Sequence, residues 1–246
     1  GYDFAGAEVA NLSDADSDPL DTHYHGTHVA GTIGAKGNNG TGIAGVCWHV
    51  KIMALKIFAD DSEEAVFSDI IPAIQYAIDN GAHVINASWG GYEYSQSLYD
   101  VIAAAQSAGI LFVAAAGNDG TERAIYPAGF DLDNIISVMA TNHNDEVAYY
   151  SNYDASDVDL AAPGGEMVET ELGGIYSTLP IEATDFMEAD GIPINYGYLQ
   201  GTSMAAPHVA GAAALMWSLN HDWTYSEIKT MILYGVDKLT TLEGLC

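Results

Sequence analysis

"SDIIPAIQYAIDNGAHVINASWGG", residues 68–91, places a helix and a buried strand next to each other in the sequence. In residues 68–81 the apolar side chains recur at helical spacing, and Asn80-Gly81 is a helix stop. Residues 82–91 form a short apolar run that ends in a glycine turn, which is typical of a strand covered on both faces. This pair predicts one unit of a parallel sheet covered by helices.

The same alternation continues on both sides of this stretch. Apolar runs at 50–58, 110–118 and 134–142 predict further strands, and helical spacing at 97–109 and 203–220 predicts further helices. Residues 162–200 are rich in glycine and irregular, so we expect loops and short strands there. The pattern indicates an α/β fold with a mostly parallel central sheet flanked by helices. In such sheets ligands bind beyond the carboxyl ends of the strands.

Length and charge restrict the classes of protein. The 246 residues, 49% of them hydrophobic, suit a single domain over residues 1–246. With 34 acidic and 6 basic residues the net charge is −28, which argues against nucleic-acid and anionic-membrane partners. The apolar runs are too short to span a membrane. The charge suits either solubility in a salty medium or attraction of cations and basic peptides. Cys47 and Cys246 make no disulfide framework.

Three segments contain candidate catalytic residues, and each also has an ordinary structural interpretation. "THYHGTHVAGT" (22–32) contains His23, His25 and His28, which suit a zinc site, a general base or a plain helix start. In "AAAGNDG" (114–120), Asn118 is either a turn residue or a donor to an oxyanion. In "GTSMAAPHVAG" (201–211), Ser203 is either a helix cap or a nucleophile.

Taken together and in this order, these segments closely resemble the subtilisin-like serine proteases (subtilases). "GIAGV" (42–46), "VKIMALKIF" (50–58) and "VINASWGG" (84–91) extend the resemblance over nearly the whole chain. It implies a three-layer subtilisin-like fold and a secreted endopeptidase that cleaves peptide or protein substrates through an acyl-enzyme. A pro-segment is a further partner of such an enzyme.

The resemblance also implies roles for individual residues. Ser203 is the nucleophile, and its hydroxyl is expected close to the ring of His25, the general base. Asn118 and the backbone N–H of Ser203 are the oxyanion donors. His28 and His208 are structural, and His23 has no catalytic role. The alternative of a zinc site rests only on the three histidines, and their spacing is looser than zinc ligands usually show.

Small residues are expected to form the substrate site. The segment Ser88, Trp89, Gly90 and Gly91 resembles the edge strand that pairs with a substrate backbone. With Ala115, Ala116 and Gly117 it would wall a roomy pocket for a large uncharged side chain before the cut bond. Trp89 is expected to serve packing more than specificity.

One member of the expected triad is absent. A subtilase has an orienting aspartate on a strand well upstream of the histidine, in a motif like D-[ST]-G, and the 24 residues before His25 contain none. We therefore expect a peptidase domain truncated at both ends. Asp14, Asp16, Asp18 and Asp21 are assigned to the loop before His25 and not to this role. A catalytically silent binding module on the same fold is the alternative.

The acidic loop has a second interpretation. "DADSDPLD" (14–21) places Asp14, Asp16 and Asp18 at alternate positions, which suits calcium, with Asp3 as a further ligand. The alternative is a solvated acidic turn. A second calcium loop is suggested at "AKGNNGTGI" (35–43), where the side chain of Asn39 and the carbonyls of Lys36, Thr41 and Ile43 would bind. That site is expected to be weak or empty.

Overall fold

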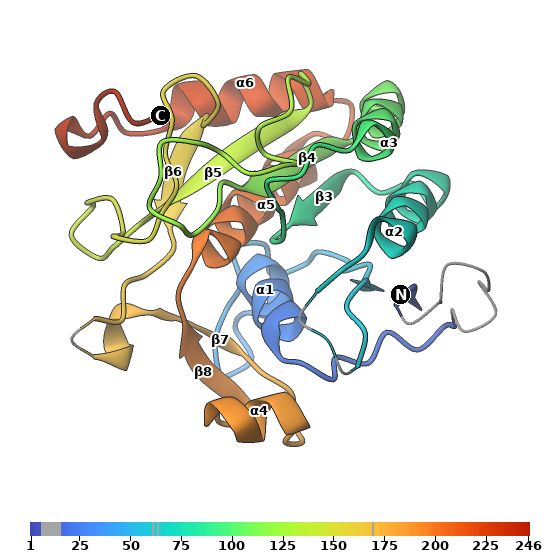
Figure 1. Cartoon of the computed structure of the whole chain (residues 1–246), viewed down its shortest axis with the longest axis vertical. Helices are drawn as coiled ribbons and strands as arrows, with labels where there is room; N and C mark the ends of the chain where they lie inside the picture. The colour runs from blue at the N-terminus through green and yellow to red at the C-terminus, as the bar shows by residue number, and fades with distance from the viewer. Residues whose placement is uncertain (6–15, 61, 63, 169) are drawn as a thin grey trace.

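The central sheet has four parallel strands. The structure, a computed structural model, describes residues 1–5, 16–60, 62, 64–168 and 170–246. The strands lie in the order β3 (Val84–Ala87), β4 (Leu111–Ala115), β5 (Ile135–Thr141) and β6 (Leu160–Pro163) (Figure 1). Val84 lies opposite Leu111, and Phe112 lies opposite Ile135. The strands predicted within 82–91, 110–118 and 134–142 are confirmed, with shorter bounds.

Helices cover both faces of this sheet. On one face lie α2 (Phe67–Asp79) and α3 (Gln96–Ser107), and on the other lie α5 (Thr202–Leu219) and α6 (Tyr225–Gly235). Successive residues of β4 alternate between the two cores. Phe112 packs with α2 and α3, whereas Leu111 and Val113 pack with α5 and α6, and all three are fully buried. The three-layer α/β prediction is therefore confirmed.

Local capping explains two of the helix boundaries. The Ser95 hydroxyl accepts the Leu98 N–H and starts α3. Thr224 and Glu227 form a reciprocal capping box at the start of α6. The box stands in the sequence as "TYSE", a signal for α6 that the periodicity analysis did not use.

Helix α1 (His25–Gly34) packs on α5 and on β7. Strands β7 (Ile175–Thr178) and β8 (Tyr196–Leu199) form an antiparallel pair, and α4 (Asp185–Asp190) lies between them in the sequence. Two 3₁₀ turns, η1 and η2, lie at Glu171–Gly173 and Thr240–Leu242. Residues 162–200 are therefore loops and short elements, as predicted.

The strand expected over 50–58 is mostly wrong. Within it, β2 covers only Leu55–Lys56, which pair with β1 (Tyr2–Asp3) in a separate two-stranded sheet. A strand is held by its neighbours, and no described strand lies between β2 and β3. The apolar composition of residues 50–58 is therefore not enough to form a longer strand without a neighbouring strand. None of the described helices is long and apolar enough to cross a membrane.

Candidate active site

His25, Asn118 and Ser203 line one cavity of about 1630 Å³. His25 is the first residue of α1, Asn118 follows the carboxyl end of β4, and Ser203 lies in the first turn of α5. The same cavity extends along residues 51–58 on one side and Val84 to Asn86 on the other, which is the gap between β2 and β3. The site thus lies at the carboxyl edge of the sheet, where the fold predicted it.

Reciprocal hydrogen bonds hold Ser203 against the segment after β3. The Ser203 hydroxyl donates to the Ser88 carbonyl (3.1 Å), and the Ser88 hydroxyl donates to the Ser203 carbonyl (2.7 Å). Asn86 Nδ2 in turn donates to the Ser88 hydroxyl (2.9 Å). Within the described residues no hydrogen bond joins Ser203 to the His25 ring, so the nucleophile is placed in the cleft with its hydroxyl turned to Ser88.

The two candidate oxyanion donors lie close together near Gly201. Asn118 Oδ1 accepts hydrogen bonds from the N–H (2.8 Å) and the hydroxyl (2.9 Å) of Thr202. A Cβ at Gly201, where φ is +146°, would lie 3.5 Å from Asn118 Nδ2 and 3.6 Å from the Ser203 nitrogen. Two N–H groups and Asn118 Oδ1 (3.6 Å) therefore lie near the same point, and the positive φ favours glycine there. The two N–H groups are candidate donors to a developing oxyanion. Sequence reasoning missed Thr202, although a hydroxyl residue at a helix start was a usable signal.

His25 is neutral at pH 7. The pKa of its imidazole is lowered to about 4, chiefly by burial and also by the charges of His23 and His28, while the carboxylate of Asp21 acts in the opposite direction. A neutral imidazole can accept a proton, but a pKa this low makes it a weak base. Among the described residues no carboxylate receives a hydrogen bond from the His25 ring.

The other histidines have separate structural environments. His28 is fully buried with Nε2 2.9 Å from the Ile175 carbonyl, and burial lowers its pKa to about 4. His208 places Nδ1 2.8 Å from the Met204 carbonyl. The His23 ring lies 4.2 Å from that of Tyr24 and 4.7 Å from that of Phe186. Across the described ranges no group of three or more His, Cys, Asp or Glu could hold a metal ion, so these histidines are not gathered for zinc.

Most of the predicted substrate residues line the cavity, namely Ser88, Trp89, Gly90, Ala115 and Gly117. Gly91 and Ala116 do not. Gly91 exchanges both backbone hydrogen bonds with Tyr126 (2.9 and 2.8 Å), so its backbone is not available to a substrate. Ala116 is fully buried in the α2–α3 core, because side chains alternate across a strand. Gly90 is needed sterically, since a Cβ there would lie 2.6 Å from the Tyr126 carbonyl oxygen.

A carboxylate borders the pocket that was predicted to take a large uncharged side chain of the substrate. Asp119 lines the cavity directly after Asn118, and Tyr92 Oη donates to its Oδ2 (2.7 Å). The buried Asn152 accepts the Asp119 N–H through Oδ1 (2.9 Å) and fixes this turn. The guanidinium of Arg123 lies 4.8 Å from the centre of the Tyr92 ring. Only the fold brings these residues together.

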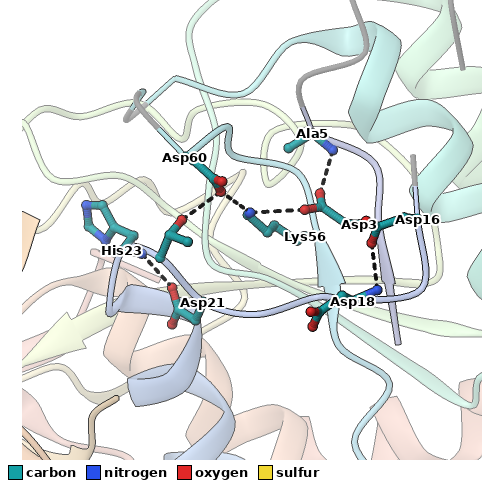
Figure 2. Close-up of polar contacts among 9 residues, drawn as sticks. Asp3, Ala5, Asp16, Asp18, Asp21, His23, Lys56 and Asp60 are labelled. Carbon is teal, nitrogen blue, oxygen red and sulfur yellow. Dashed lines mark hydrogen bonds and ion pairs between the residues drawn. The ribbon is translucent and has the colours of Figure 1, made fainter. Parts of the chain in front are cut away.

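A lysine lies between Asp3, one of the carboxylates assigned to calcium, and Asp60 (Figure 2). Asp3 accepts the Ala5 N–H (2.8 Å) and pairs with the Lys56 ammonium (3.0 Å), which also contacts Asp60. Burial lowers the pKa of Lys56, but its hydrogen bonds to Asp60 and Asp3 raise it overall. Asp3 is therefore already neutralised and does not fit as a calcium ligand.

The other candidate ligands form no complete site in the part of the chain that the structure describes. Asp16 Oδ1 accepts the Asp18 N–H (2.7 Å), and Asp14 lies outside the described residues. In the second loop, Asn39 Oδ1 accepts the Thr41 N–H (3.0 Å), which closes a turn. Asp16 and Asp18 alone are too few for calcium, which takes six to eight oxygen ligands.

Comparison with known proteins agrees with this geometry. The model of the subtilase family matches residues 5–243. The chain is 38% identical over 240 residues to the thermophilic serine proteinase of Bacillus sp. (strain AK1), covering 98% of this chain and 51% of that protein. It is also 38% identical over 240 residues to thermitase of Thermoactinomyces vulgaris, covering 97% of this chain and 77% of thermitase. The chain thus spans about half the length of the first relative.

Solved structures give the same result. A protease of Pseudoalteromonas arctica superposes with a TM-score of 0.83 at 33% identity, covering 97% of this chain and 77% of that one. A cold-adapted subtilisin-like serine proteinase superposes with a TM-score of 0.76 at 29% identity, covering 98% of this chain and 77% of that one.

Proposed function

The chain belongs to the subtilase family, and from this premise we propose that it is a secreted serine endopeptidase with Ser203 as nucleophile. The observation that carries the proposal is that His25, Asn118 and Ser203 line one cavity, with Asn118 Nδ2 and the Ser203 nitrogen close to each other near Gly201. A side-chain amide and a helix N-terminal N–H that lie close together are suited to stabilise an oxyanion.

The proposed reaction is an acyl transfer. Ser203 Oγ leaves its hydrogen bond to Ser88 and attacks the scissile carbonyl carbon, while His25 takes the hydroxyl proton. Asn118 and the Ser203 N–H hold the carbonyl oxygen as it gains negative charge. His25 then gives its proton to the leaving amine, and water, activated by the same ring, releases the acid product.

A fluorophosphonate probe tests this assignment. We expect one covalent adduct on Ser203, found by peptide mass spectrometry, and none in Ser203→Ala. Ser226→Ala removes an exposed serine on α6 and should label like the native chain. An adduct elsewhere, or none in the native chain, would refute Ser203 as an activated nucleophile.

A catalytically silent binding module is the second candidate. It is favoured by the lack of a described carboxylate that receives a hydrogen bond from the His25 ring. Peptide retention with neither probe labelling nor turnover would support this alternative.

We further propose that the carboxylate that orients His25 is supplied by chain upstream of Gly1. The cavity between β2 and β3 supports this, because it leads from the open edge of β3 to His25. The buried Asn86 Oδ1 at this edge has no hydrogen-bond partner in the structure, and an added strand would offer one. A pro-segment is proposed as a further partner.

Calcium is proposed for the acidic loop with a reduced ligand set. Asp14, Asp16 and Asp18 remain the candidate ligands, and Asp3 is left out because Lys56 pairs with it. The second loop has Asn39 as its one side-chain candidate, so we do not extend the proposal to it.

A further inference from the structure

Asp21 spans the start of the helix that carries His25. Its Oδ2 accepts hydrogen bonds from the N–H (2.7 Å) and the hydroxyl (2.6 Å) of Thr27. Its Oδ1 accepts the His23 N–H (3.0 Å), and Figure 2 shows that contact. One carboxylate therefore ties together the residues on both sides of His25.

This helix start has no cap of the ordinary kind. The residue before His25 is Tyr24, whose side chain makes no capping hydrogen bond. An uncapped first turn leaves N–H groups without acceptors and carries a partial positive charge. Asp21 accepts one of these N–H groups, that of Thr27, and places a negative charge near the turn, while the His25 N–H donates to His23 Nδ1 (3.3 Å). Its neighbour Thr22 donates to Asp60 Oδ1 (2.9 Å), which fixes the preceding loop.

The charge of Asp21 also acts on the His25 ring. It raises the pKa of His25, against burial and the like charges of His23 and His28, which lower it. The other ionisable side chains that line the cavity are Tyr24, Cys47, His49, Lys51, Lys56, Tyr76, His83, Asp119 and His221. Of the three charged neighbours that shift the pKa of His25, Asp21 is the one that raises it and so favours the protonated ring.

We propose that Asp21 is a positioning residue for His25, which holds the first turn of α1 and stabilises the imidazolium formed during catalysis. The inference rests on the proposed function, because it assigns a role in the reaction to a residue of the same site. Asp21 does not replace the orienting aspartate. Its described hydrogen bonds go to the backbone and hydroxyl of Thr27 and to the backbone of His23, and none goes to the His25 ring.

Three variants separate charge from capping. Asp21→Asn keeps an acceptor oxygen and removes the charge, whereas Asp21→Ala removes both. Asp79→Asn is the matched control, because it removes the same charge from an exposed site at the end of α2. For each variant, NMR follows the titration of the His25 ring, and the fluorophosphonate rate on Ser203 is measured against pH with the melting temperature recorded alongside.

In Asp21→Asn we expect the His25 titration and the acid limb of labelling to move to lower pH. The plateau labelling rate should fall about tenfold, the usual scale for losing one charged hydrogen-bonding partner. Asp21→Ala should lose more, with a lower melting temperature, and Asp79→Asn should match the native chain.

The proposal is overturned if Asp21→Asn titrates like the native chain or if Asp79→Asn shifts His25 equally. If Asp21→Ala fails to fold, the His25 titration and the labelling rate of Asp21→Asn still test the proposal. If the native chain does not label, the proposed function fails, and the NMR titration still tests whether Asp21 acts on His25.

Discussion

The side-chain oxygen of Asn118 is held by Thr202 through two hydrogen bonds, one from the backbone N–H and one from the hydroxyl. These two contacts fix the plane of the amide, with Nδ2 and Oδ1 3.5 and 3.6 Å from a Cβ built on Gly201. Thr202 is fully buried, and its hydroxyl oxygen also accepts the Gly117 N–H (3.2 Å). Thr202 therefore sets the orientation of the Asn118 amide, the proposed oxyanion donor.

Thr202→Val should lower kcat with little change in KM. Valine keeps the shape but removes one of the two hydrogen bonds to Asn118, so the amide is less well directed in the transition state. We expect a loss of about tenfold, less than removal of a whole oxyanion donor costs. Steady-state kinetics on a peptide anilide measure this change. Thr202→Ser keeps the hydroxyl and should retain native kcat, so equal losses in both variants would contradict the argument.

Acid should destabilise the chain through His28. Its pKa is about 4 in the folded chain and 6.5 as the ordinary value, because burial disfavours the charged ring. Between these values the unfolded chain binds the proton and the folded chain does not. The stability present above pH 6.5 is therefore lost as pH falls toward 4, by up to about 3 kcal/mol.

His28→Gln removes this titration, and its amide can still donate to the Ile175 carbonyl. Thermal melts from pH 7 to 4.5 should show a flatter decline for this variant than for the native chain. His143→Gln alters an exposed histidine and should leave the native slope. A native slope in His28→Gln would exclude His28 as the source.

Periodicity and motifs predicted much of this molecule, for local reasons. The spacing of apolar residues predicts the helix at 68–81 and the strand at 110–118. The motifs around His25, Asn118 and Ser203 identify these three residues as candidates. What failed depends on distant partners. The stretch 50–58 has strand composition, yet only Leu55 and Lys56 pair. The ion pair of Lys56 with Asp3 could not be predicted from the sequence, because it forms only when β1 lies beside β2.

Calcium should stabilise the chain through Asp14 and Asp16 and not through Asp3. Calcium that binds only the folded chain raises the melting temperature by mass action, and a chelator should lower it. Asp14→Asn with Asp16→Asn should abolish this response. Asp3→Asn should lower the melting temperature in every buffer, by the equivalent of about 1 kcal/mol for a lost ion pair with Lys56, and keep the response. An unchanged response in the double variant would show that calcium binds elsewhere.

The chain of residues 1–246 should cleave peptides very poorly, and a version extended upstream through an aspartate-bearing strand should be far more active. An orienting aspartate holds the correct imidazole tautomer and stabilises the imidazolium. Loss of that residue is known to cost about 3 × 10⁴ in kcat in subtilisin, a relative, and that figure sets the expected scale. The added strand would also occupy the cavity between β2 and β3 and offer a partner to the unpaired Asn86 Oδ1.

The pH profile distinguishes the added carboxylate from a general gain in folding. In residues 1–246 the pKa of His25 is about 4, because burial outweighs the charge of Asp21, so the acid limb of kcat/KM should lie near pH 4. A carboxylate at the ring favours the protonated form and should move this limb upward, toward the ordinary value of 6.5. The extended version with its strand aspartate changed to asparagine is the control, and it should keep the stability gain without the shift. Equal turnover by the short and the extended chains would show that a carboxylate within residues 1–246 already orients His25, and Asp21 would then be the first residue to test.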